Sequence, residues 1–132
     1  MTFDEMETML DEIAYEIPKE FYKELNGGII LSPEIKHHPE SHYHPGGLYI
    51  MGEYHNDRKG YGGLGRYIKM YYGSFMQLYS NMPPQRLREE LKRVLIHEFT
   101  HHIESLAGER GLEIKDAVQL EKYRLRRRRR EQ

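Results

Sequence analysis

The chain has 132 residues with a formal net charge of −1, and 38% of them are hydrophobic and 31% charged. This length predicts one domain with a modest core, and no apolar run approaches the roughly 20 residues of a membrane span, which excludes stable membrane insertion. The chain has no cysteine, which excludes disulfides and thiolate metal sites and leaves histidine and carboxylate side chains to bind any zinc. The N-terminus lacks the basic and apolar regions of a signal peptide, which favours a cytoplasmic location.

The N-terminal region is predicted to be helical. Thr2 is a suitable N-cap because Glu5, three residues further on, completes a capping box. Pro18 is expected to divide this region into helices at residues 3–16 and 18–25. Apolar residues recur every three or four positions, as a helix with one buried face requires: Phe3, Met6, Met9, Leu10, Ile13, Ile17, Phe21 and Leu25.

Three strands follow in the predicted order of elements. The first is the apolar run Ile29–Leu31, the second covers Leu48–His55, and the third covers Arg66–Tyr72. A Gly-Ser pair at 73–74 is expected to kink the third strand before Phe75–Tyr79. Together they predict a small sheet.

A proline-rich loop is predicted between the first two strands, over residues 32–47. Four histidines lie within it and a fifth follows: His37, His38, His42, His44 and His55. A second metal site is one interpretation, because His42 and His44 would share a face of an extended segment. A solvated loop is the preferred interpretation, because this proline-rich segment does not place a pair of histidines on a helix. A third interpretation is a flap whose histidines touch the active site.

The main helix is predicted over residues 84–107. Pro84 suits a first helical turn, and Gly108 is expected to be the C-cap. A final helix is predicted from Leu112 to Leu125. Residues 1–123 are predicted to make one domain. Residues 124–132 then form a basic tail that contains six arginines, whereas residues 1–25 carry eight acidic side chains.

The main helix contains an HExxH motif, His97 to His101. Residues four apart lie on one face of a helix, so His97 and His101 can direct imidazole nitrogens at one zinc ion. Glu98 then lies beside the metal, where it can act as general base toward a zinc-bound water. The alternative is a core helix with two incidental histidines, which the intervening glutamate makes the weaker interpretation.

A third zinc ligand is expected after His101. The helix is expected to end about two turns beyond the metal, and a returning segment would bring residues 113–116 level with it. Asp116 is the first choice, although it would also suit the N-cap of the final helix. Glu113 and Glu121 are the second and third choices, and Glu104 is better placed to orient a histidine.

The chain resembles the small bacterial zincin-like metallopeptidase family. The likeness covers the opening residues 1–6, the stretch 17–21, the Tyr-Gly-Gly-Leu run at 61–64 and the helix that ends in His-Glu-Phe-Thr-His-His. It implies a minimal zincin-like α+β fold with an N-terminal helix, a small twisted sheet, an active-site helix and a C-terminal helix. It also implies zinc held by His97 and His101 with Glu98 as base. The chain departs from the family pattern in having Glu104 and Ala107 where a glycine and an acidic residue are usual.

The leading functional prediction is a zinc metalloendopeptidase with one zinc per chain that hydrolyses peptides or unfolded protein segments. The strand Arg66–Tyr72 is a candidate for pairing with an extended peptide. The alternatives are an RNA- or ribosome-associated metalloprotein, whose arginine tail binds RNA or anionic lipid, and a metal-binding domain without catalysis. For the tail itself, a solvated helix end is the preferred interpretation, and docking on the acidic first helix is a further one.

Overall fold

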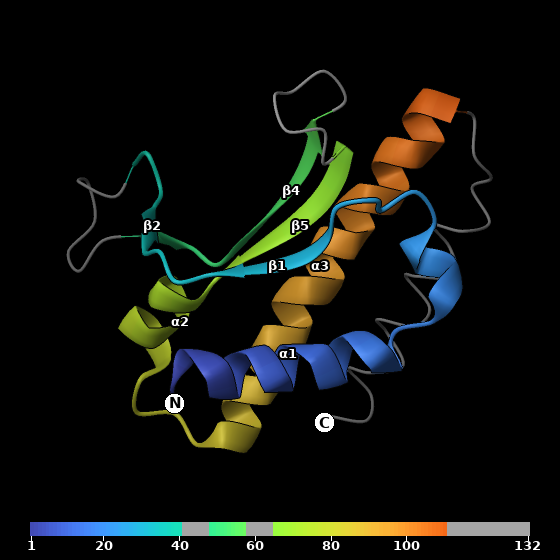
Figure 1. Cartoon of the computed structure of the whole chain (residues 1–132). Helices are drawn as coiled ribbons and strands as arrows, with labels where there is room; N and C mark the ends of the chain where they lie inside the picture. Colours follow the sequence, from blue (N-terminus) through green and yellow to red (C-terminus); the bar gives the residue numbers. More distant parts are fainter. Residues whose placement is uncertain (41–47, 58–64, 111–132) are drawn as a thin grey trace.

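A computed structural model describes residues 1–40, 48–57 and 65–110 of the chain, and these form an α+β fold (Figure 1). The helices are α1 (Phe3–Glu16), the short 3₁₀ helix η1 (Lys19–Tyr22), α2 (Tyr72–Tyr79) and α3 (Pro84–Arg110). The strands are β1 (Gly28–Ser32), β2 (Lys36–His37), β3 (Tyr49–Ile50), β4 (Gly52–Asp57) and β5 (Gly65–Tyr71). The predicted α+β class is confirmed at this level.

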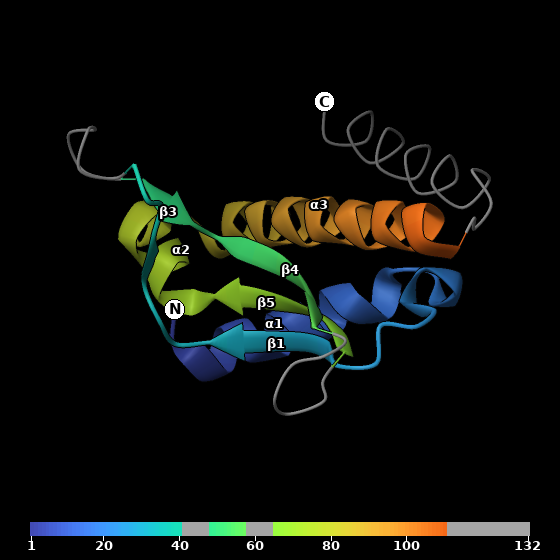
Figure 2. The same ribbon diagram turned by 90° about the horizontal axis from the view of Figure 1, so that it is seen from above.

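The main sheet has three strands in the order β1-β5-β4. β1 is parallel to β5, whereas β4 is antiparallel to it. β5 is therefore the central strand and β4 an edge strand of the described sheet, on the side nearest α3 (Figure 2). β2 and β3 form a separate antiparallel pair within residues predicted to be partly loop.

The N-terminal helix begins and ends as predicted. Thr2 and Glu5 exchange both hydrogen bonds of a capping box, at 2.9 and 3.1 Å. α1 ends before Pro18, whose ring cannot continue a helix. The predicted second helix at 18–25 is wrong in length, because only Lys19–Tyr22 forms a 3₁₀ turn before Glu24 enters the left-handed region with φ 62°.

The hydrophobic core lies between the sheet and the helices α1 and α3, which cover one of its faces (Figure 1). Every apolar position predicted for the buried face of the first helix, apart from Phe3 and Met9, is buried. The core consists of Met6, Leu10, Ile13, Ile17, Phe21, Leu25, Ile68, Met70, Phe75, Leu87, Leu91, Val94, Leu95, Phe99 and Ile103. α3 supplies the largest share, which fixes its position under the sheet.

A charged clamp joins α1 to α3 beside the core. The Lys92 ammonium lies 2.6 Å from one carboxylate oxygen of Glu16, and the Arg88 guanidinium lies 2.6 Å from the other. Arg88 also contacts Glu12 at 3.3 Å. The Lys92 side chain is 7% exposed, so this pair is shielded from solvent more than the usual surface ion pair.

The segment after the third strand is helical, and the expectation of a kinked strand there is wrong. Tyr72, Met76 and Tyr79 pack against the core and Phe75 is fully buried within it, a spacing of three and four that suits a helix. The hydroxyl of Ser74 accepts a hydrogen bond from the Lys36 amide at 2.9 Å and anchors this helix, α2, to β2. The short run of aromatic residues concealed this helical period in the sequence.

Two further boundaries differ from the prediction. The second predicted strand divides at Met51 into β3 and β4, and the Met51 carbonyl accepts a hydrogen bond from the Tyr71 amide at 2.9 Å. Gly108 is not the C-cap of the main helix, because α3 continues to Arg110. A single glycine costs an exposed helix only about 1 kcal/mol, which the buried face of α3 offsets.

Several predicted features lie outside the described residues. They are His42 and His44, the Tyr-Gly-Gly-Leu run, the final helix at 112–125 and the arginine-rich residues 124–132. Within the part of the chain that is described, no helix is long and apolar enough to cross a membrane.

Candidate functional site

The two histidines of the HExxH motif converge on the surface of α3. The Nε2 atoms of His97 and His101 are 3.1 Å apart, and their rings are nearly perpendicular, at 86°. Helical spacing of four residues brings the two side chains together, and both are exposed. The pair therefore presents two imidazole nitrogens to one point in space.

A cleft of about 780 Å³ opens over this pair, between α3 and β4. Its α3 side contributes His97, Glu98, His101, Glu104 and Ser105, and its strand side contributes Ile50, Gly52, Glu53 and Tyr54. β4, an edge strand of the described sheet, borders the cleft. The face of α3 that carries His97, Glu98 and His101 therefore lies beside this strand.

β4 and α3 run in the same direction along the cleft (Figure 2). The Tyr54 hydroxyl donates to Nδ1 of His102 at 2.8 Å, and the Asn56 amide donates to the Ser105 hydroxyl at 3.4 Å. Contacts between β4 and α3 therefore recur at about every second residue of the strand. This is because two residues of a strand span about the same distance as one turn of a helix. The strand is fixed against the helix over the length of the site.

Gly52 allows this close approach at the start of β4. A Cβ atom at this position would lie 3.0 Å from both the Met70 sulfur and Val94 Cγ1, and 3.5 Å from Glu98 Cγ. An added Cβ would require these neighbouring side chains to give way by a few tenths of an ångström. The glycine therefore suits the narrow strand–helix spacing beside Glu98.

Glu98 is buried beside the exposed histidines, with 6% of its surface accessible. Burial raises the pKa of its carboxyl, while nearby His101 lowers that pKa and the negative charge of Glu53 raises it. The Tyr54 backbone donates a hydrogen bond to the carboxylate and opposes the rise in pKa. Glu98 is thus held by the edge strand at the wall of the cleft, and its raised pKa favours proton transfer.

His102 has a structural position that the sequence analysis did not single out. It is fully buried, and its Nε2–H donates to the Lys23 carbonyl at 2.8 Å, which leaves Nδ1 to accept from Tyr54. Burial lowers the pKa of the His102 imidazole, so the neutral form is favoured. Both ring nitrogens are engaged with protein, which separates His102 from the histidine pair of the motif.

The predicted third ligand is not among the described residues. Asp116, Glu113 and Glu121 all lie in residues 111–132. Within residues 1–40, 48–57 and 65–110, no three histidine, aspartate or glutamate side chains gather in a way that could hold a metal. Glu104 lies near His101, but its Oε2 is 3.6 Å from Nδ1 rather than from the Nε2 that faces His97.

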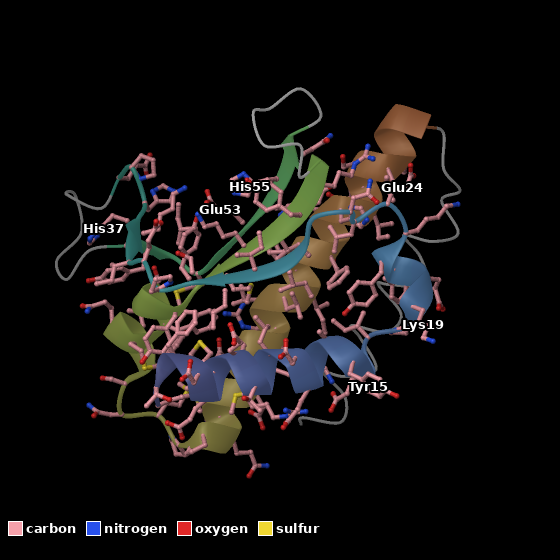
Figure 3. The ribbon with its side chains drawn as sticks, viewed as in Figure 1. Tyr15, Lys19, Glu24, His37, Glu53 and His55 are labelled. Carbon is pink, nitrogen blue, oxygen red and sulfur yellow. The ribbon has the colours of Figure 1, made fainter. Side chains whose placement is uncertain are left out.

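A second polar cluster lies on the outer face of the sheet, next to the cleft (Figure 3). Glu53 contacts the Lys36 ammonium at 2.7 Å, accepts a hydrogen bond from the Tyr71 hydroxyl, and lies 3.5 Å from Nε2 of His55. Burial, followed by the hydrogen bond to Glu53, raises the pKa of Tyr71 to about 12. The contacts of Glu53 with Tyr71 on β5 and with Lys36 on β2 were not predicted, because they depend on how the strands pair and on their register.

The described histidines of the loop, His37 and His38, make contacts other than those of this cluster. The His37 ring packs against Tyr49, with ring centroids 5.1 Å apart, and Nδ1 of His38 accepts from the Glu40 amide at 3.1 Å. Figure 3 shows His37 at the β2 end of the molecule, away from Glu53 and His55. His42 and His44, for which a second metal site was one interpretation, lie outside the described residues.

The fold and the cleft define a class of small α+β protein in which a histidine pair and a buried glutamate lie beside an edge strand. No family model and no curated protein matches the chain. Among solved structures, it is similar to a conserved hypothetical protein from Thermus thermophilus, with 30% identity, a TM-score of 0.68, and coverage of 81% of this chain and 98% of that one. The chain belongs to the family of that conserved hypothetical protein.

These findings contradict the resemblance to the small bacterial zincin-like metallopeptidase family. No family model supports it, the matched structure is a conserved hypothetical protein, and the described residues contain no set of three metal-binding side chains. The motif that carried the resemblance is short, and helical spacing alone aligns its two histidines. The family assignment from sequence is therefore wrong.

Proposed function

We propose that this protein is a zinc-dependent hydrolase that cleaves peptide bonds in the cleft between α3 and β4. The observation that carries the proposal is the convergence of the His97 and His101 Nε2 atoms, 3.1 Å apart, beside the buried carboxylate of Glu98. The proposal includes a zincin-like arrangement of an active-site helix beside an edge strand. A cytoplasmic location remains a prediction from the sequence.

The separation of the two histidine nitrogens supports the proposal of a zinc site. Two nitrogens that bind one tetrahedral zinc ion at 2.0–2.1 Å lie about 3.3 Å apart, close to the separation of the two Nε2 atoms. The pair faces a cleft rather than the core, which leaves room for a further protein ligand and a water molecule. Asp116 remains the first choice for that ligand, followed by Glu113 and Glu121.

The residues of the cleft would divide the work of hydrolysis. When bound, zinc would polarise the scissile carbonyl and acidify a water molecule. Glu98 would take a proton from the attacking water and deliver it to the departing amine. The hydrogen bond from the Tyr54 backbone would help to orient the Glu98 carboxylate, and Glu98 is one of the residues that line the cleft.

The strand that we propose for peptide binding differs from the one that the sequence suggested. β5, which contains Arg66–Tyr71, lies between β1 and β4 and therefore has no open edge for a peptide. β4 borders the cleft, so we infer that an extended peptide would lie along β4, opposite the histidine helix. The open cleft suits flexible segments and short peptides.

The test is zinc content together with hydrolysis of an unfolded protein substrate, with the chain purified without a histidine tag. The wild type is expected to hold one zinc per chain and His101→Ala none. Glu98→Gln is expected to keep zinc and lose turnover by about 100-fold or more. Glu89→Gln, on the same helix outside the cleft lining, is the matched control and should match the wild type.

Two outcomes would overturn the proposal. A metal-replete wild type without zinc would remove the metal site. Zinc that is retained with no Glu98-dependent turnover would favour the metal-binding domain without catalysis. The RNA- or lipid-binding alternative depends on residues 124–132, and their removal with loss of RNA binding would support it for the tail alone.

A further inference from the structure

We propose that Glu104 is a positioning residue for His101, and this inference depends on the metal site proposed above. Its carboxylate would accept the Nδ1–H of His101 and thereby keep the Nε2 lone pair directed toward the point shared with His97. Neither a ligand role nor a surface ion pair describes the geometry as well.

The position of Glu104 relative to the ring carries the argument. Its Oε2 lies 3.6 Å from His101 Nδ1, whereas Nε2 on the other side of the ring lies 3.1 Å from His97. A carboxylate at Nδ1 is on the wrong side of the imidazole to join the two Nε2 atoms around one ion. It is on the correct side to accept the ring proton, as the outer partners of metal-binding histidines do.

Local structure supports the contact. Glu104 follows His101 by three residues on α3, so the two side chains lie on adjacent turns of one face. The 3.6 Å separation is a few tenths of an ångström beyond a hydrogen bond. The Glu104 side chain is 62% exposed and is free to rotate by the small amount that closes this gap.

The contact also fixes how the histidine pair shares its protons in the metal-free chain. If Nδ1 of His101 carries the proton, its Nε2 can only accept. Nε2 of His97 must then donate across the 3.1 Å separation. Without Glu104, no carboxylate of this residue accepts the Nδ1–H of His101. The Nδ1–H tautomer is then no longer favoured by it, and the proton can move to Nε2.

Two measurements test the inference on the full chain. Long-range ¹H–¹⁵N NMR of the metal-free protein, with His101→Ala to assign the signal, should show the Nδ1–H tautomer of His101 in the wild type. Competition with a zinc chelator should show about tenfold weaker zinc binding in Glu104→Ala, together with a shift toward the Nε2–H tautomer. Glu89→Ala, at a half-buried glutamate of the same helix outside the cleft lining, should change neither.

Glu104→Gln separates positioning from charge, because its amide oxygen still accepts a hydrogen bond. This variant should keep more zinc affinity than Glu104→Ala and retain the Nδ1–H tautomer. Equal losses in the two variants, or an unchanged tautomer and affinity in Glu104→Ala, would overturn the positioning role while the metal site stands. Absence of zinc binding in the wild type would overturn both proposals.

Discussion

Gly52→Ala tests whether the narrow spacing between β4 and α3 is set by this one residue. The added methyl would lie 3.0 Å from the Met70 sulfur and 3.0 Å from Val94 Cγ1, inside ordinary van der Waals contact. Met70 is fully buried and Val94 is 6% exposed, so neither neighbour can move into solvent. The two side chains, or the strand and helix that carry them, must give way by a few tenths of an ångström.

The expected cost follows from two opposing contributions. Overpacking a filled core costs about 1–3 kcal/mol, whereas replacing glycine by alanine restricts the unfolded chain and stabilises the fold by about 0.4–1 kcal/mol. The free energy of unfolding should therefore fall by about 0.5–2 kcal/mol. For a chain of this size, a loss of 1 kcal/mol lowers the melting temperature by roughly 4 °C.

Gly108→Ala is the matched control, because a Cβ at Gly108 meets nothing within 4 Å and the residue lies inside α3. It should raise the free energy of unfolding by about 0.5–1 kcal/mol. Urea unfolding of both variants and the wild type measures the difference, and amide hydrogen exchange should be faster in β4 of Gly52→Ala. If Gly52→Ala stabilises the protein as Gly108→Ala does, the close approach of β4 does not depend on the glycine.

Two further substitutions test other contacts. In Gly73→Ala, a Cβ would lie 2.7 Å from the Glu34 backbone and 2.6 Å from an Ile35 side-chain carbon. Calorimetry should therefore show a larger loss of stability than for Gly52→Ala. An equal or smaller loss would contradict this packing. The hydrogen bond from Lys92 holds the pKa of the Glu16 carboxyl below its ordinary 4.5, so the folded state binds this proton less readily than the unfolded state. The resulting stability, no more than about 1 kcal/mol, is present above pH 4.5 and is lost as the pH falls through the lowered folded pKa. Urea unfolding of Glu16→Gln should show a smaller decrease over that acid range than the wild type, and identical pH profiles would refute the contribution of the clamp.

Features that depend on neighbours in sequence were predictable. The capping box at Thr2, the break at Pro18 and the spacing of His97 and His101 are all set within a few residues, and the structure shows each at the expected place. Helical period and cap chemistry determine such features with little influence from the remainder of the chain. The same reasoning predicted the buried face of α1, because an amphipathic period already specifies which side meets a core.

Features that depend on strand pairing were not predictable in the same way. The placement of β5 at the centre of the sheet, which removes Arg66–Tyr71 as a peptide-binding edge, follows from its pairing with both β1 and β4. The Glu53 cluster depends on the register that places Glu53 opposite Lys69. A shift of one residue would have sent Glu53 to the other face, and nothing local in the sequence sets that register.

The alternation of exposed and buried residues along the motif explains how α3 serves the core and the cleft together. His97 and His101 are exposed, whereas Glu98 and His102, each one position later, are buried. One step along a helix turns the side chain by about 100°, so residues adjacent in sequence meet different surroundings. His102 secures the helix to Tyr54 and to the Lys23 carbonyl, and this fixes the rotation of α3 that directs the other two histidines into the cleft. The orientation of the exposed histidine pair is therefore a consequence of how the neighbouring face of the same turn is buried.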